Sequence, residues 1–367
     1  MGSLKVIEKL KSAGQSLWLG HFSRQSIRDG ILNRAMADWS VSGVAFSPQA
    51  VYQGLSDTDV YDSTIFEKLS RGLYGEALVY SEIIEDVQYA ADILRPVHNR
   101  TKGAEGWVVM QVSPLSTNDD RFFVSEYKHM DRLVNRPNVL FCLPVTPVRL
   151  SLIEELVSAG IKTIISNVYS VKQYHATAKA VLSGFERSLE AGAELDLSVF
   201  ITINIERMES FLRQKNNAQE SAELTIAMAR EIYHAMRELD NAPEWERVYR
   251  AGARPPRIVW SLFRGDGSKE PDSSFCDKLI APDTVLVLSH DVIARCSTQP
   301  VDETFMSLDN STAEQARTNS SLVDLDGRVE ADRLQREYIA WLSREWAILL
   351  ENFARRSAGV LPARTLD

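Results

Sequence analysis

The sequence predicts a single α/β domain of the (β/α)8, or TIM-barrel, class with an additional C-terminal helix. Eight short apolar runs are bounded by turn residues, and amphipathic helical segments separate most of them. No glycine-rich phosphate loop of the GxGxxG or GxxxxGK[ST] type follows any run, which argues against a nucleotide-binding sheet. A chain of 367 residues with 44% hydrophobic content can bury a barrel-sized core. We therefore expect one domain over residues 1–367.

The eight predicted strands are nearly continuous hydrophobic runs, as is typical of parallel strands that are buried on both faces. Their short length and the flanking turn residues favour strands over helices. In chain order they are QSLWLG (15–20), VSGVAFS (41–47), GWVVMQVS (106–113), NVLFCLPV (138–145), KTIISNVY (162–169), LSVFITINI (197–205), RIVWSLF (257–263) and DTVLVLS (283–289).

The segments between these strands place apolar residues at helical spacing. In chain order they are 23–39, 54–97, 151–160, 170–192 and 220–239. The polar stretch 300–327 is rich in helix breakers and predicts a connection. The last segment, 328–357, has a strong amphipathic pattern, and we expect this helix to pack on the outside of the barrel.

Composition and charge exclude several classes of function. The net charge of -9 and the pI near 5.4 argue against a nucleic-acid partner, which would need clustered Lys and Arg. Three cysteines without CxxC spacing and six scattered histidines predict a reduced compartment and no metal site. The N-terminus has no signal-peptide pattern, and no run of 18 apolar residues predicts a membrane span. We expect a cytoplasmic protein with no membrane partner and no cofactor.

Six separated blocks of the chain resemble transaldolases of the longer actinobacterial type, in the same order and over almost the whole length. The blocks are LWLGHFSRQSIRDGIL (17–32), VSGVAFSPQAVYQGLSDTDVYD (41–62), ADILRPVHNRTKGAEGWVVMQVSP (91–114), RPNVLFCLPVTPVRLSLIEELVSAGI (136–161), GARPPRIVW (252–260) and DKLIAPDTV (277–285). The resemblance implies a barrel whose active site lies at the C-terminal ends of the strands.

The same resemblance implies that the chemistry of the site has changed. Transaldolases form a Schiff base on a fourth-strand lysine, and Cys142 occupies that position here. The first-strand aspartate that acts as acid and base corresponds to Gly20, with His21 next to it. Ser47 stands in the place of an asparagine after the second strand, and Gln111 in the place of a third-strand glutamate. An amide keeps the shape of the carboxylate but cannot take a proton at neutral pH.

The later strands differ in the same way. Ser166 replaces the fifth-strand threonine, which is the mildest change. On the sixth strand, a substrate-binding serine falls near Ile203 and a phosphate-binding arginine on Asn204. After the seventh strand Arg264 remains, although Leu262 replaces a serine. The scaffold blocks persist while the catalytic groups do not, so the site has been rewritten or retired.

Four residues are candidates for catalysis, each with a structural alternative. His21 can act as a general acid or base, and Gln111 and Ser166 can orient a substrate or a water molecule. A structural His21 and a mutual hydrogen bond between Gln111 and Ser166 are the alternatives. Cys142 is either a nucleophile or a small apolar filler, and the apolar run around it favours the filler because burial raises the pKa of a thiol.

Further residues are candidates for substrate binding or are structural. Trp18 and Trp260 would line a pocket more apolar than a sugar phosphate needs, or they belong to the core. Arg264, with Lys269 nearby, either holds an anion after the seventh strand or lies in a solvated loop. The acidic stretch DTDVYD (57–62) resembles a metal motif, but we interpret it as structural.

Three hypotheses for function follow. The first is an enzyme of lyase, isomerase or cyclase type in specialised metabolism. Such an enzyme has lost imine chemistry and acts on a less polar small molecule, with or without a phosphate group. The second is a non-catalytic transaldolase-like protein that binds a metabolite or a regulatory partner. The third is residual transaldolase activity through another lysine, for which Lys269 is the candidate.

Overall fold

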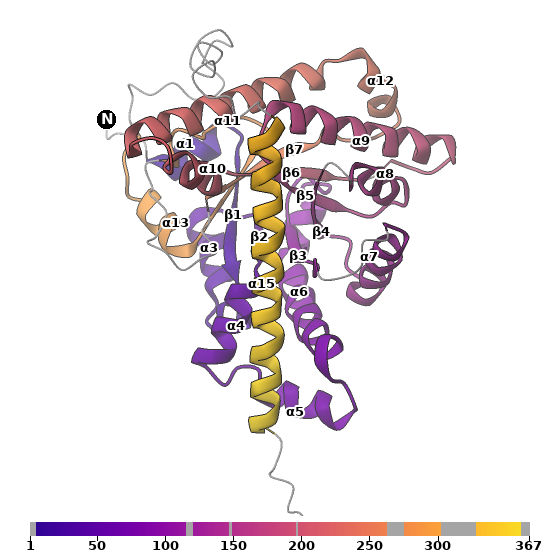
Figure 1. The fold of residues 1–367 in the computed structure, drawn as a ribbon, viewed down its shortest axis with the longest axis vertical. Coiled ribbons are helices and arrows are strands. Elements are labelled where there is room, and N and C mark those ends of the chain that lie inside the picture. Colours follow the sequence, from indigo (N-terminus) through magenta and orange to yellow (C-terminus); the bar gives the residue numbers. More distant parts are fainter. Residues whose placement is uncertain are drawn as a thin grey trace, which may run out of the picture.

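Eight parallel strands close into a barrel in chain order, which confirms the predicted fold class. The computed structural model describes residues 5–114, 120–146, 149–195, 197–262, 275–301 and 328–360. Each strand pairs with the next, and β8 pairs with β1 to complete the closure (Figure 1). The strands are β1 (Ser16–Phe22), β2 (Gly43–Phe46), β3 (Trp107–Gln111), β4 (Val139–Pro144), β5 (Thr163–Val168), β6 (Val199–Asn204), β7 (Arg257–Leu262) and β8 (Val285–Leu288).

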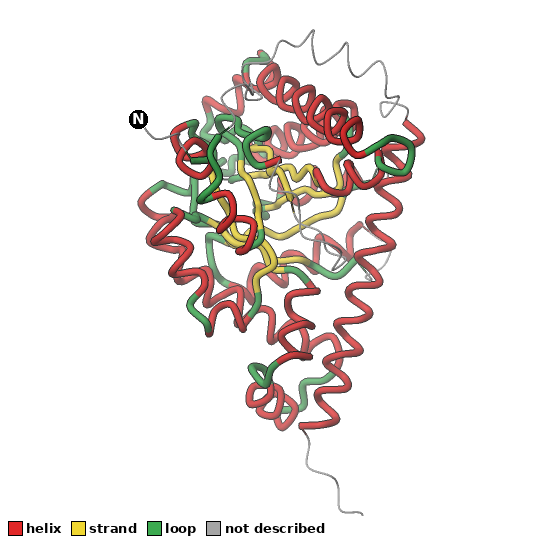
Figure 2. The backbone as a smooth tube through the Cα atoms, turned by 90° about the vertical axis from the view of Figure 1, so that its left-hand side faces the viewer, coloured by secondary structure: helices red, strands yellow, loops and turns green. Residues whose placement is uncertain are grey.

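Helices surround this barrel, so that both faces of each strand are buried (Figure 2). They are α1 (Val6–Ser12), α2 (Arg24–Arg28), α3 (Ile31–Trp39), α4 (Pro48–Asp57), α5 (Asp62–Ser70), α6 (Gly75–Arg100), α7 (Asp120–Val134), α8 (Leu150–Ser158), α9 (Val171–Glu190), α10 (Ile205–Leu212), α11 (Ala218–Asp240), α12 (Pro243–Arg250), α13 (His290–Cys296) and α15 (Arg328–Val360). Every segment predicted as helical contains a helix. The long predicted segment 54–97 is divided, and the turn at Gly72, with φ of 84°, separates α5 from α6.

Side chains of the strands alternate between the helix-facing layer and an inner core inside the barrel. This inner core consists of Trp18, Trp107, Val109, Leu140, Cys142, Ile164, Phe200, Val259, Val285 and Val287. The Phe200 ring lies 5.2 Å from that of Trp18 and 6.0 Å from that of Trp107 between centroids. Aromatic rings therefore fill the interior of the barrel below the C-terminal ends of its strands, so no pore runs through it.

The C-terminal helix α15 lies across the mouth of the barrel, a more specific position than the expected packing on its outside (Figure 1). Gln335 donates a hydrogen bond from Nε2 to the Asn167 carbonyl at 2.9 Å, and Asn167 Nδ2 donates to the Gln335 carbonyl at 3.2 Å. Further along the helix, the ring of Trp346 packs 5.5 Å from that of Tyr80. The helix is therefore fixed both to the end of β5 and to α6. Among the described helices, none is long and apolar enough to cross a membrane.

Two strands are irregular where they reach the mouth. The pairing of β1 shifts register between Leu19 and Phe22, and that of β5 shifts between Ile165 and Val168. His21 and Asn167 lie inside these irregularities with φ of 56° and 76°, a conformation that costs a residue with a side chain some strain. Irregular strand ends of this kind are frequent beside binding sites because they redirect side chains.

Candidate active site

A cavity of about 470 Å³ lies at the C-terminal ends of the strands, beneath α15. All eight strands contribute to its lining, together with α10 and α15. Its volume is in the range of pockets that enclose a small molecule. The strand residues of the lining are Trp18, Gly20, Ala45, Phe46, Val109, Gln111, Cys142, Ile164, Ser166, Asn167, Thr202, Asn204, Val259, Ser261 and Val287.

The lining has an apolar floor and a polar rim. The floor is the top of the inner core, where Trp18, Val259 and Val287 face the cavity. Polar groups from the strand ends and the helices that follow them form the rim, among them Gln49 and Asn167. The aromatic side chains of the strands do not fill the mouth, so a small molecule has room between floor and rim.

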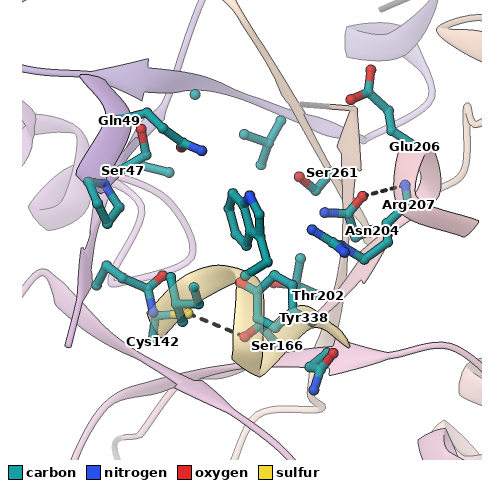
Figure 3. A pocket seen from close by; sticks show the side chains of 18 of the residues that line it. Ser47, Gln49, Cys142, Ser166, Thr202, Asn204, Glu206, Arg207, Ser261 and Tyr338 are labelled. Carbon is teal, nitrogen blue, oxygen red and sulfur yellow. Dashed lines mark hydrogen bonds between the residues drawn. The ribbon is translucent and has the colours of Figure 1, made fainter. Parts of the chain in front are cut away.

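Cys142 lies on the inner face of β4, at the junction of floor and rim. Its Sγ donates to Ser166 Oγ at 3.5 Å, which Figure 3 marks as a dashed line. Burial raises the pKa of the thiol to about 11, and the contacts with Ser166 and Gln111 only partly oppose this shift. At neutral pH the group is therefore a thiol and a weak nucleophile.

Gln111, Cys142 and Ser166 form one edge of the site, as the sequence predicts for neighbouring strands. Gln111 of β3 pairs in register with Cys142 of β4, and Ser166 lies on the adjoining strand. Tyr338 of α15 completes this group because it lines the same side of the cavity, beside Ser166 (Figure 3). Burial raises the pKa of Tyr338, so its phenol is neutral at physiological pH. A protein hydroxyl, an amide and a thiol thus meet at one side of the cavity.

His21 is not part of the lining, although its neighbour Gly20 is. Its Nε2 lies 2.7 Å from Gln53 Oε1, and its Nδ1 lies 3.5 Å from Ser47 Oγ. Burial lowers the pKa of His21, so the imidazole is neutral at pH 7. These contacts hold the ring behind the rim, between β1 and α4, where a ligand in the cavity does not touch it.

Ser47 and Asn204 line the cavity and also start helices. The Ser47 hydroxyl accepts a hydrogen bond from the Ala50 amide at 3.2 Å, with Pro48 as the first residue of α4. Asn204 Oδ1 accepts from the Arg207 amide at 2.9 Å at the start of α10. A capping role therefore accounts for these two residue types without any contact to a ligand.

Two residues predicted to bind substrate point the wrong way. Ile203 and Trp260 are fully buried in the helix-facing layer and do not line the cavity, so their prediction as substrate-binding residues is corrected here. Their strand neighbours Thr202 and Ser261 face inward instead. Strict alternation along β6, starting from inward-facing Phe200, would have identified Thr202 and Asn204 as the lining residues. Arg264 lies outside the described residues.

The rim carries charged side chains from α10 and α15. Arg207 of α10 extends toward α15, where its guanidinium carbon lies 5.3 Å from the ring centroid of Tyr338 and 5.0 Å from that of Trp341. Figure 3 shows Arg207 beside Tyr338 at the edge of the cavity. Glu206 and Glu337 line the same side. The resemblance placed Arg207 close to the position of the family's phosphate-binding arginine, whereas no sequence pattern singled out Glu206 or Glu337.

The acidic stretch after α4 has structural partners. Asp62 forms a two-pronged ion pair with Arg356 of α15, and Asp59 pairs with Arg28 at 3.5 Å. The Asp62 contact attaches α15 to the start of α5, and the Asp59 contact attaches the turn before α5 to α2, so both acidic groups have structural partners. Within the described ranges, no group of three or more His, Cys, Asp or Glu side chains is arranged to hold a metal ion.

Comparison with known proteins identifies relatives along almost the whole chain. The family model described as Transaldolase/Fructose-6-phosphate aldolase matches residues 17–352. A transaldolase of Thermobifida fusca (strain YX) is 29% identical over 369 residues, covering 98% of this chain and 99% of that protein. Transaldolase 1 of Streptomyces avermitilis is 30% identical over 294 residues, 77% of each chain, and the transaldolase of Frankia alni is 30% identical over 288 residues, 76% of this chain and 77% of its own.

Proposed function

The chain belongs to the transaldolase and fructose-6-phosphate aldolase family, and from this premise we propose that it is a barrel enzyme without imine chemistry. In this proposal it acts on a small molecule less polar than a sugar phosphate, in a reaction of lyase, isomerase or cyclase type. The observation that carries the proposal is the inner face of β4, where a buried thiol stands at the position that the resemblance gives to the Schiff-base lysine.

The groups around Cys142 support the loss of imine chemistry. An imine needs an amine in contact with the substrate carbonyl, and no lysine lines the cavity among the residues that the structure describes. Lys269 lies outside them. At the end of β1, Gly20 offers no carboxylate for proton transfer, and a Cβ at this position would lie 3.1 Å from Val287 Cγ1. The first strand is thus closely packed against β8 where the family resemblance places an aspartate.

The floor of the cavity supports a less polar ligand. Trp18, Ile164, Val259 and Val287 present apolar surface toward the space where a substrate would lie. Each methylene of a ligand that leaves water there contributes about 0.8 kcal/mol, whereas the hydroxyl groups of a sugar would lose hydrogen bonds to water on the same surface. Gln111, Ser166 and Tyr338 are the groups that would orient such a ligand, and the hydroxyl groups of Ser166 and Tyr338 are those that would exchange protons with it.

A non-catalytic role is the second candidate, and the placement of His21 favours it. Histidine is the residue type whose ordinary pKa lies nearest to neutrality, so His21 would be the natural general acid or base. Its ring, however, lies behind the rim. In that case the cavity would bind a metabolite without converting it. Ligand binding without turnover over long incubation, followed by recovery of the unchanged ligand, distinguishes this candidate from an enzyme.

The direct test of lost imine chemistry is reductive trapping. We expect no covalent adduct when the protein is incubated with fructose 6-phosphate and sodium borohydride and its intact mass is measured. A transaldolase with active imine chemistry, treated in parallel, is the positive control. A mass increase that matches a reduced sugar-phosphate imine would overturn the proposal, and peptide mapping would then identify the lysine. If an adduct forms, a Lys269→Arg variant would show whether it is attached to Lys269, which lies outside the described ranges.

A further inference from the structure

Two aromatic side chains of the C-terminal helix form part of the roof of the cavity. Tyr338 and Trp341 are three residues apart on α15, so they share one face of the helix, and both line the cavity. Their ring centroids are 5.5 Å apart, and the ring planes are inclined by 37°. A flat molecule that stacks on one of these rings therefore meets the other at an angle, and both arrangements are favourable between aromatic groups.

These two rings are only half-buried, unlike the other two aromatic side chains of the same helix. Trp346 and Phe353 are 0% and 2% exposed, because their rings pack on tyrosines of α6 and of the turn before α5, at 5.5 and 5.9 Å between centroids. Packing on the barrel thus uses the whole of those rings, but it leaves part of Tyr338 and Trp341 open at the cavity. Aromatic surface outside the core adds less to folding, and a ligand that covers it gains the remainder.

Neighbouring contacts hold this aromatic pair in place. The guanidinium carbon of Arg207 lies 5.3 Å from the ring centroid of Tyr338 and 5.0 Å from that of Trp341 (Figure 3). Gln335, three residues before Tyr338, attaches the helix to the end of β5 through two hydrogen bonds with Asn167. Because the rings are held before a ligand arrives, stacking on them loses little free energy in ordering the side chains.

The floor opposite the two rings is apolar and stiff. Val109, Ile164, Val259 and Val287 line it, and all four are β-branched, so their side chains have few rotamers. The cavity between floor and roof measures about 470 Å³, which is large enough for a drug-sized molecule. A planar ligand can place one face on this floor and the other on the aromatic roof.

We propose that Tyr338 and Trp341 select a ligand with a planar unsaturated body, that is, an aromatic or conjugated ring system. This inference rests on the proposed function, since it assumes a cavity that accepts a less polar ligand, and it adds the class of that ligand and the residues that select it. Apolar burial alone does not distinguish a flat ring system from a saturated one, whereas stacking on an aromatic face does. The selection therefore depends on α15 and not on the floor.

The test compares two neutral probes of similar size, of which only one is planar. The first is 2-naphthol, and the second is decahydro-2-naphthol, its saturated counterpart with the same hydroxyl group. By isothermal titration calorimetry with the full chain at about pH 7, we expect 2-naphthol to bind at least about fivefold more tightly, because stacking adds to apolar burial. The saturated probe is no less hydrophobic, so a cavity without stacking would not prefer 2-naphthol.

Substitutions of one tryptophan locate the preference. Trp341→Leu removes the ring but keeps an apolar side chain, and it should reduce the preference to about twofold or less. Trp341→Phe retains a ring and should keep most of the preference. Trp39→Leu is the matched control, because Trp39 is also half-buried but does not line the cavity, and it should leave the preference unchanged. Thermal unfolding of each variant shows whether it is folded.

A spectroscopic measurement makes the test independent of the affinity of any variant. In protein that contains 5-fluorotryptophan, the fluorine resonances of Trp341 and Trp39 are assigned from the variants that lack them. We expect saturating 2-naphthol to shift the Trp341 resonance and to leave the Trp39 resonance in place, because only Trp341 lines the cavity. An unshifted Trp341 resonance at saturation would contradict stacking on this ring.

The outcomes separate this inference from the proposed function. Equal affinity for the two probes, or a preference that survives in Trp341→Leu, overturns the inference and leaves a cavity for apolar ligands intact. Failure of both probes to bind at millimolar concentration overturns it as well. If fructose 6-phosphate is trapped by borohydride in the same protein, the proposed function fails too, because the site then handles a sugar phosphate.

Discussion

Cys142 lies at the centre of the site, and we expect its thiol to react weakly as a nucleophile. The thiol faces the cavity, yet only 6% of Cys142 is exposed, with the inner core below it and the helix α15 above it. A thiolate there would lack the solvation and the neighbouring cation that catalytic cysteines have. The resemblance points to Cys142 as the altered position, and the buried surroundings of the thiol argue against a replacement nucleophile.

The pKa of Cys142 gives a prediction for its reactivity. With a pKa of about 11, only about one thiol in a thousand is ionised at pH 8, so we expect iodoacetamide to modify Cys142 at least about 100-fold more slowly in the native protein than in urea. The rate should rise about tenfold per pH unit toward pH 11. Peptide mass spectrometry with timed quenching measures it separately from Cys276 and Cys296. Rapid native labelling at pH 7 would contradict a buried thiol.

The raised pKa of Cys142 also makes the stability of the folded protein depend on pH. Because the pKa of Cys142 in the folded protein is above its ordinary value of 9.0, the folded state holds this proton more firmly than the unfolded chain does. The contribution is fully present below pH 9 and is lost as the pH rises from about 9 to about 11. Ionisation of the thiol therefore favours unfolding in alkaline solution.

At the scale of elements, the C-terminal helix is the part that turns a generic barrel into this site. Its apolar stripe packs on α4, α5, α6 and the end of β5, and its Arg356 reaches Asp62 at the far end. The residues between these contacts roof the cavity. The positive φ of Asn167, at the irregular end of β5, turns the chain so that its side-chain amide meets α15.

The two hydrogen bonds between Asn167 of β5 and Gln335 of α15 can be tested by mutating Gln335. We expect Gln335→Ala to lower the free energy of unfolding by about 1–3 kcal/mol, because the buried Asn167 carbonyl loses its donor. The neighbouring Arg336→Ala changes an exposed residue of the same helix and should stay within about 0.5 kcal/mol. Urea unfolding followed by circular dichroism provides both values. Equal stability of the two variants would mean that the hydrogen bonds between Gln335 and Asn167 do not hold α15 on the barrel.

At the scale of the whole molecule, closure of the barrel depends on packing inside it. The inner core combines two tryptophans, a phenylalanine and several β-branched residues, and it leaves no room on β2 beside Trp18. A Cβ added to Gly43 would lie 2.7 Å from three atoms of the Trp18 ring. Glycine is needed at position 43 because the backbone of β2 passes directly over the Trp18 ring.

This packing predicts a large effect from a single methyl group. We expect Gly43→Ala to destabilise the protein by about 1–3 kcal/mol, because the Trp18 ring has to move within a filled core. Gly359→Ala is the matched control, because nothing lies within 4 Å of that position in α15 and alanine favours a helix. Thermal unfolding should therefore show a lower midpoint for the first variant and an unchanged or higher midpoint for the second. Equal midpoints would contradict the tight contact with Trp18.

The local pattern of apolar residues was enough to predict the eight strands of the barrel. Each of the eight predicted strands overlaps an observed one, and the predicted run 257–263 contains the whole of β7. Strands buried on both faces give long apolar runs, and this signal is local, so it can be read without knowing the tertiary structure. The same local signal identified the amphipathic helix at the C-terminus, and the family resemblance pointed to Gly20, Gln111, Cys142 and Ser166, all of which line the cavity.

Tertiary structure alone decided which surface that last helix covers and which side chains face inward. An apolar stripe shows that a helix is packed, but it does not show against what, so the roof formed by Tyr338 and Trp341 could not be predicted. A shift of one residue along a strand exchanges its inner and outer faces, which is why Ile203 was predicted to line the site and Thr202 does. The stacked position of Arg207 also depends on two helices that are more than 100 residues apart in the chain and meet only in the folded barrel.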